Sequence, residues 1–103
     1  MIILGAKLPM KSDPRIEYTS LFNKQRKAVP LEIKEAFFEA LRLYLIDPKH
    51  PALRNHALRG KLSGRRSIDV TEDYRAVFRE TNKKGQIFIV FHLIGTHREL
   101  YGE

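Results

Sequence analysis

Residues 67–78, with the sequence SIDVTEDYRAVF, alternate between apolar and polar side chains in two runs that flank a polar turn. A period of two is typical of strands that bury one face. If both apolar faces point into the core, Ile68 pairs with Ala76, because directly opposed residues share a face. The stretch therefore predicts an antiparallel hairpin with a three-residue turn, and it places Asp69 opposite Arg75 on the outer, solvated face.

The chain after this hairpin continues the sheet. Residues 81–85, TNKKG, predict a second hairpin turn, in which Gly85 can take a positive φ. Residues 87–94 are almost all apolar, which is typical of a central strand covered on both faces. Together the two turns predict a three-stranded antiparallel meander.

The chain before the hairpin predicts one strand and two helices. Residues 16–19 alternate in polarity and suit a short strand, and residues 20–27 are compatible with a helix capped by Ser20. A longer helix follows Pro30 and ends at Asp47, which precedes a proline. Its apolar stripe has spacings of three and four and comprises Ile33, Phe37, Leu41, Tyr44 and Leu45. Phe38, Leu43 and Ile46 widen the stripe and predict burial on more than one side.

The chain is long enough for one domain. Its 103 residues and 12.0 kDa lie well below the size at which chains split, and we expect a single α+β domain over residues 15–103. The N-terminal strand and two helices pack on one face of the meander in this prediction. Residues 1–14 lack periodicity and contain two prolines, so we expect a flexible leader, or residues upstream of a start at Met10.

Composition restricts the chemistry and the location. There are no cysteines, which excludes disulfides, thiol catalysis and cysteine-based metal sites. No apolar run approaches the roughly 20 residues of a membrane helix, so we expect no membrane partner and a cytoplasmic protein. The four histidines lack the spacing of a metal site, and no glycine-rich phosphate loop is present. We therefore expect neither a metal nor a cofactor.

The charge favours a polyanionic partner. Nineteen Lys and Arg residues against twelve Asp and Glu give a net charge of +7. Nucleic acid, a membrane surface or an acidic protein would each fit, whereas a basic surface that only keeps the protein soluble would need no partner. Basic residues concentrate between positions 54 and 79. The candidates for RNA binding are Lys61, Arg65, Arg66 and Arg79.

Histidine and arginine supply what RNA cleavage without a metal requires. The 2′-hydroxyl can attack the neighbouring phosphate if one group takes its proton and another protonates the leaving 5′-oxygen. Histidine titrates near neutral pH and suits both roles, and the arginine fork suits the developing phosphorane charge. Residues 56–79 and 97–101 contain these residue types.

Three motifs in this order resemble the RelE/ParE superfamily of bacterial toxins, and within it the YafQ-like mRNA interferases. They are H-x-L-x-G at residues 56–60, D-Y-R at 73–75 and G-T-H-x-x-L-Y at 95–101. The resemblance covers about residues 15–102 and implies a small RelE-like domain. It further implies the toxin of a type II toxin–antitoxin system, a metal-independent endoribonuclease that cuts mRNA on the ribosome. Such a toxin contacts ribosomal RNA and is held inactive by a partner antitoxin, with which it can form a hetero-oligomer.

The resemblance also implies roles for individual residues. His97 matches the histidine used in proton transfer, and Tyr101 matches the closing aromatic that contacts the substrate. Asp73 matches an acidic active-site position, and His56 matches the histidine of the preceding loop. Arg75 matches the arginine that supports the scissile phosphate in the more RelE-like members.

One position departs from this pattern and leaves alternatives open. Asp69 stands where the YafQ-type motif has a second histidine. Either Asp69 takes part of that role, or proton transfer rests on His97, His56 and Asp73. The departure also leaves room for a non-catalytic relative that only binds antitoxin. A ParE-like inhibitor of DNA gyrase, which shares the fold without cleaving RNA, is the other alternative.

Overall fold

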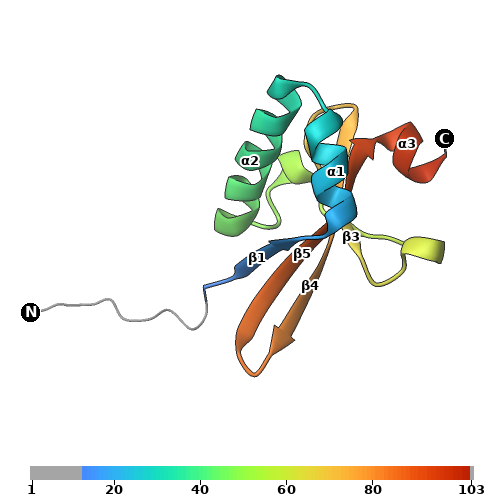
Figure 1. The fold of residues 1–103 in the computed structure, drawn as a ribbon. Helices are drawn as coiled ribbons and strands as arrows, with labels where there is room; N and C mark the ends of the chain where they lie inside the picture. The colour runs from blue at the N-terminus through green and yellow to red at the C-terminus, as the bar shows by residue number, and fades with distance from the viewer. Residues whose placement is uncertain (1–12, 103) are drawn as a thin grey trace, which may run out of the picture.

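The computed structural model describes residues 13–102, which form a five-stranded sheet with two helices on one face (Figure 1). The strands are β1 (Arg15–Tyr18), β2 (His56–Ala57), β3 (Arg66–Asp69), β4 (Tyr74–Lys83) and β5 (Gln86–Thr96). The helices are α1 (Ser20–Ala28), α2 (Leu31–Ile46) and α3 (His97–Tyr101), with short 3₁₀ turns η1 (Pro51–Leu53) and η2 (Gly60–Leu62). The predicted α+β class is confirmed. Most of the expected leader, residues 1–12, lies outside the described residues.

The sheet is mixed, with the strand order β1-β5-β4-β3-β2. The predicted meander is present as the antiparallel strands β3, β4 and β5. The N-terminal strand β1 joins the sheet at its edge and runs parallel to β5, because α1 and α2 carry the chain across the sheet. The two-residue strand β2 extends the other edge and was not predicted. No helix among residues 13–102 is long and apolar enough to span a membrane.

The register of the first hairpin is the one that the alternation predicted. Ile68 pairs with Ala76 and Asp69 with Arg75. Both Ile68 and Ala76 are fully buried against the helices. The hairpin thus fixes which side chains of β3 and β4 face the core.

The second hairpin turn is shorter than predicted. β4 continues to Lys83, which pairs with Gln86, so the turn contains only Lys84 and Gly85. Both turn residues have positive φ, 54° and 86°, as two-residue hairpin loops prefer. The Asn82 carboxamide oxygen accepts a hydrogen bond from the Gly85 amide at 2.9 Å and stabilises this conformation.

Aromatic rings fill the core between the helices and the sheet. Phe37 on α2 lies 5.2 Å from Phe22 on α1 and 5.0 Å from Phe91 on β5, measured between ring centroids. Phe78 on β4 completes this group at 5.4 Å from Phe91. All four rings are fully buried, so the core links both helices to the two central strands.

The predicted burial of α2 on more than one side is wrong. Phe38, Leu45 and Ile46 are 43%, 45% and 76% exposed, because only the opposite side of the helix contacts the sheet. At that side, the Tyr44 hydroxyl donates a hydrogen bond to the Glu80 carboxylate. Burial and this hydrogen bond raise the pKa of Tyr44.

Strand β5 is central but is covered by helices α1 and α2 on one face only. Ile89 and Phe91 point into the core, whereas Val90 and Leu93 are partly exposed. The continuous apolar run predicted a cover on both faces; instead, the second face is left for the short helix α3 and the loop around η2 (Figure 1). We call this second face of the sheet the open face.

Replacing Phe37 with alanine should destabilise the fold strongly. The substitution leaves a cavity at the centre of the aromatic core, and we expect a loss of about 3–5 kcal/mol in the free energy of unfolding. Denaturant titration measures it. Phe38→Ala is the matched control on the exposed side of the same helix and should cost less than about 1 kcal/mol. Equal losses for both variants would contradict this description of the core.

Candidate active site

A row of directly paired residues crosses the open face of the sheet. His56 on β2 pairs with Ser67 on β3, Ser67 pairs with Val77 on β4, and Val77 pairs with Leu93 on β5. Directly opposed residues share a face, so these four side chains lie on one side of the sheet. We call them the cross-strand row. It brings one predicted site residue, His56, onto the open face.

Helix α3 carries two further predicted site residues, His97 and Tyr101, and it brings Tyr101 to this row. The Thr96 hydroxyl accepts a hydrogen bond from the Glu99 amide at 3.1 Å, and the Glu99 carboxylate accepts one from the Thr96 amide at 2.8 Å. This reciprocal pair starts the helix directly after β5. A side chain at Gly95 would place its Cβ 3.0 Å from the Glu99 carboxylate, which explains the glycine of the G-T-H motif.

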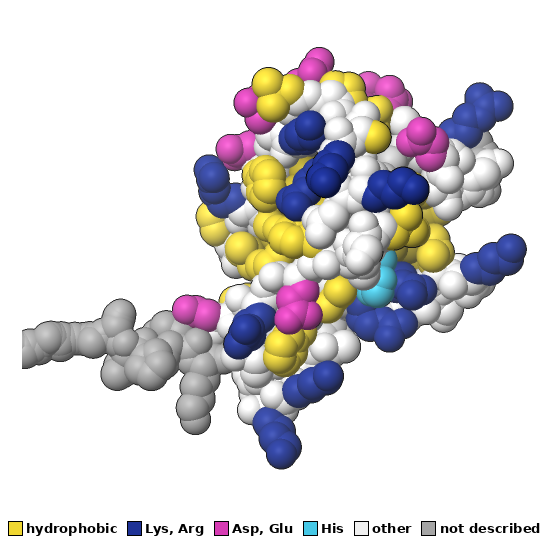
Figure 2. Space-filling model, viewed as in Figure 1, with side chains coloured by type: hydrophobic (Ala, Val, Ile, Leu, Met, Phe, Trp, Pro, Cys, Tyr) yellow, Lys and Arg dark blue, Asp and Glu magenta, His cyan; other side chains and the backbone are white. Residues whose placement is uncertain are grey.

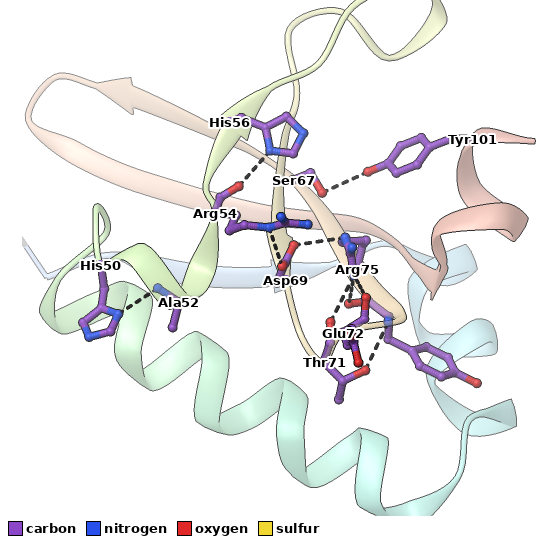
Figure 3. Close-up of polar contacts among 11 residues, drawn as sticks. His50, Ala52, Arg54, His56, Ser67, Asp69, Thr71, Glu72, Arg75 and Tyr101 are labelled. Atoms are coloured by element: carbon purple, nitrogen blue, oxygen red, sulfur yellow. Dashed lines mark hydrogen bonds and ion pairs between the residues drawn. The ribbon is translucent and has the colours of Figure 1, made fainter. Parts of the chain in front are cut away.

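Tyr101 connects helix α3 with the cross-strand row. Its hydroxyl donates a hydrogen bond of 2.9 Å to the Ser67 hydroxyl (Figure 3). The His97 ring packs edge-on against the Tyr101 ring at 4.6 Å between centroids, and His97 itself is exposed. Ser67 is fully buried and was missed by the sequence analysis. Its position opposite His56 could have identified it, once β2 was recognised as a strand.

The contact of His56 indicates which ring nitrogen carries a proton. His56 is exposed, and its Nδ1 lies 2.7 Å from the backbone carbonyl oxygen of Arg54. A carbonyl only accepts, so Nδ1 carries the proton. In the neutral ring, Nε2 therefore keeps its lone pair and can accept a proton from a substrate.

Asp69 and Arg75 form a buried ion pair instead of a solvated one. The Arg75 Nε lies 3.0 Å from one Asp69 carboxylate oxygen, and the Arg54 Nε donates to the other at 2.9 Å. The first contact has the geometry of an ion pair rather than of an aligned hydrogen bond. Arg75 is only 7% exposed and also donates to the backbone carbonyls of Thr71 and Glu72 (Figure 3). The expectation of a solvated outer face is wrong at this point.

These bonds make Arg75 a support for the turn between β3 and β4. The guanidinium is directed to protein acceptors, so its placement does not favour the direct phosphate contact that the resemblance implied. The turn contains Asp73, whose side chain is exposed and whose carbonyl oxygen accepts a hydrogen bond from the His97 amide at 3.0 Å. Arg75 thus holds the turn that holds the first residue of α3.

Two of the predicted RNA-binding arginines lie together near β5. Arg65 lines a hollow with His92, and the charges of Arg65 and Arg79 both act on the His92 ring. A Cβ added to Gly64 would contact Arg79 Nη2 at 3.4 Å, so the loop after η2 lies against Arg79. Lys61 is exposed in η2 itself. In Figure 2, Lys and Arg side chains lie beside the visible histidine and also over the upper, helical part, where most of the visible Asp and Glu side chains lie.

Arg66 lies apart from this group. Alternation along β3 places Arg66 on the face opposite Ser67, where its Nε donates to the Asn55 carboxamide oxygen at 2.7 Å. There it lines a separate cavity of about 710 Å³ with Tyr44 and Glu80. The structure therefore does not bring Arg66 to the open face.

His92 differs from the core histidine that its apolar surroundings predicted. It is partly exposed and lines the hollow beside Arg65. Partial burial, followed by the positive charges of Arg65 and Arg79, lowers the pKa of His92 below its usual value. The ring is therefore neutral at neutral pH.

Among residues 13–102, no group of three or more His, Asp and Glu side chains is placed to hold a metal ion.

Replacing Asp69 with asparagine should cost about 3 kcal/mol in the free energy of unfolding, because it leaves the buried Arg75 guanidinium without its counter-charge. Thermal or denaturant unfolding measures the loss. Asp73→Asn is the matched control in the adjoining turn, where the carboxylate is exposed, and it should cost less than about 1 kcal/mol. A neutral Asp69→Asn substitution would show that the ion pair does not hold the turn.

Comparisons with known proteins identify the fold through structures alone. No family model and no curated protein matches the chain. A crystal structure of YafQ from E. coli strain BL21(DE3) has a TM-score of 0.72 at 22% identity and covers 86% of this chain and 99% of that one. A chain in the crystal structure of the E. coli DinJ–YafQ toxin–antitoxin complex has a TM-score of 0.70 at 22% identity. The match covers 87% of this chain and 99% of that one.

A YoeB/ParE toxin from Agrobacterium tumefaciens has a TM-score of 0.67 at 15% identity and covers 81% of this chain and 98% of that one. In all three comparisons, nearly the whole length of the solved chain is matched. The chain therefore has the RelE/ParE-like toxin fold and is similar to YafQ, as the resemblance of its motifs predicted.

Proposed function

We propose that this protein is the toxin of a type II toxin–antitoxin system and cuts mRNA on the ribosome without a metal. The observation that carries the proposal is the arrangement on the open face. His97 packs against Tyr101, Tyr101 bonds to Ser67, and Ser67 pairs with His56. His97 thus packs on the Tyr101 ring, and the serine bonded to the Tyr101 hydroxyl is the strand partner of His56. The similarity to YafQ and YoeB/ParE structures supports a toxin role.

The proposed reaction is an internal transfer at one phosphate of the RNA. The 2′-oxygen attacks the adjacent phosphorus, the bond from phosphorus to the 5′-oxygen breaks, and a 2′,3′-cyclic phosphate forms. The lone pair on His56 Nε2 takes the 2′-proton, and His97, as the principal proton-transfer residue, protonates the leaving 5′-oxygen. Tyr101 positions the nucleotide between the two rings.

Asp73 assists His97 in this proposal, because its turn is bonded to the first residue of α3. Its carboxylate is exposed in that turn. Asp69 is already neutralised by Arg54 and Arg75, so we assign it no proton transfer. Arg75 is a positioning residue.

The remaining cations bind the substrate and the ribosome. Lys61, Arg65 and Arg79 surround the open face near η2 and would hold phosphates of mRNA and ribosomal RNA. Arg66 lies on the opposite face and would contribute to affinity only if RNA extends around the sheet edge. A ribosomal substrate would require the protein to act in the cytoplasm.

A cognate antitoxin is the proposed protein partner. One of the structures similar to this chain is a complex of a toxin with its antitoxin, that of DinJ and YafQ. The outer side of α2 exposes Leu31, Phe38, Leu45 and Ile46, which an antitoxin could cover in a hetero-oligomer.

Replacing His97 with alanine should abolish cleavage. In primer extension on a reporter mRNA with purified ribosomes, the wild type should cut only when ribosomes are present. His97→Ala should reduce the rate at least about 100-fold, since it removes the principal acid. His50→Ala is the matched control, because His50 lines the separate cavity on the other side of the sheet and should leave cleavage intact.

Wild-type rates in His97→Ala would contradict the assignment of the acid. Inhibition of DNA supercoiling by gyrase, with mRNA left intact, would replace the proposal with the ParE-like alternative. Antitoxin binding without either activity would identify a non-catalytic relative.

A further inference from the structure

The hollow that Arg65 and His92 line is on the open face, beside the cross-strand row. It has a volume of about 300 Å³ and is lined by Thr19, Leu21, Leu62, Arg65, His92 and Leu93. Three leucines give it an apolar lining, and one imidazole supplies a flat ring. We call it the His92 hollow. The proton-transfer residues of the proposed function do not line it.

A β-bulge shapes this hollow. Val77 pairs with Leu93, but the next residue, Phe78, pairs with Phe91, so His92 is an extra residue in β5. Neighbouring strand residues normally face opposite sides of a sheet, whereas His92 and Leu93 both line the hollow. The Thr19 hydroxyl donates a hydrogen bond to the His92 carbonyl oxygen at 3.3 Å and fixes the backbone there. His92 follows the core residue Phe91 and so faces the open face by alternation, and the bulge adds Leu93 to the same face.

The register places the hollow within reach of RNA bound at the proposed active site. Leu93 belongs to the cross-strand row and is two strands from Ser67, to which Tyr101 is bonded. Two strand spacings amount to about 10 Å. An RNA chain positioned on Tyr101 would reach the hollow within a few nucleotides.

The charge around the hollow complements a nucleotide and not a bare phosphate. Arg65 lines it and the charge of Arg79 acts on the same imidazole, so the phosphates next to a bound base would have two guanidinium groups nearby. The neutral His92 ring offers one hydrogen-bond donor, one acceptor and a face for stacking. Apolar walls with an aromatic ring and flanking cations are what single-stranded nucleic acid sites use to hold an unstacked base.

We propose that the His92 hollow binds an unstacked base of single-stranded RNA within a few nucleotides of the cleaved phosphate, while Arg65 and Arg79 hold the phosphates near that base. This inference rests on the proposed function, because it concerns the RNA that the active site would cut. The hollow would contribute to substrate recognition, and His92 would determine which base is preferred at that position near the cut.

The test measures binding of an RNA that cannot be cut. A fluorescent single strand of about eight nucleotides with 2′-O-methyl riboses is compared with a strand of equal length that lacks all bases. His92→Ala should weaken binding of the RNA about tenfold and leave binding of the baseless strand unchanged within about twofold. Equal weakening of both strands, or none, would overturn the inference. His50→Ala is the control and should change neither affinity.

A second pair of variants guards against misfolding of His92→Ala. Leu21 and Leu31 are 49% and 66% exposed in the first turns of α1 and α2, where glutamate is favourable for a helix. Leu21→Glu places a carboxylate at the hollow and should weaken RNA binding at least about fivefold more than Leu31→Glu does. Equal effects would contradict a base at this site.

The binding test and the cleavage test distinguish a failure of the inference from a failure of the proposed function. RNA binding that depends on His92, without ribosome-dependent cleavage, would overturn the proposed function and keep the hollow as an RNA site. Cleavage with an unchanged pattern of cut sites in His92→Ala would keep the proposed function and overturn the inference.

Discussion

The buried ion pair between Asp69 and Arg75 connects the sheet to the candidate active site. Its two residues are direct partners in the β3–β4 hairpin, and Arg75 also bonds to the carbonyls of the turn. The same turn accepts the amide of His97 through Asp73. Because a charge with so little exposure is costly unless it is paired, the hairpin, the turn and the start of α3 are held as one unit. The side chains proposed to act on RNA depend on this unit for their placement.

The open face is the consequence of an asymmetric sheet. Both long helices pack on one side, where the four phenylalanines form the core, and this leaves the other side to α3, η2 and the polar residues (Figure 1). The cross-strand row runs along that free side from His56 to Leu93. Reaction and substrate recognition would thus share one row, with proton transfer near Tyr101 and base binding near His92.

The sequence predicted the parts of this arrangement that follow from local alternation and from motifs. The pairing of Asp69 with Arg75 required only that Ile68 and Ala76 share the core face. The sequence could not predict that Arg75 is buried, because the backbone carbonyls that accept its hydrogen bonds are positioned only in the folded turn. Arg66 was grouped with Arg65 by proximity in the chain, although the pleat sends its side chain to the other face. The bulge at His92 leaves no sign in an apolar run, so the placement of His92 and Leu93 together on the open face needed the structure.

The chemistry of the cut ends tests the central claim most directly. The fragments from a reporter mRNA, cleaved by the wild-type protein on ribosomes, can be examined for the groups at their new termini. Attack by the 2′-oxygen predicts a 2′,3′-cyclic phosphate or its 3′-phosphate hydrolysis product on one fragment and a 5′-hydroxyl on the other. A 3′-hydroxyl with a 5′-phosphate would show that water and not the 2′-oxygen attacks, and it would contradict the roles given to His56, His97 and the open face.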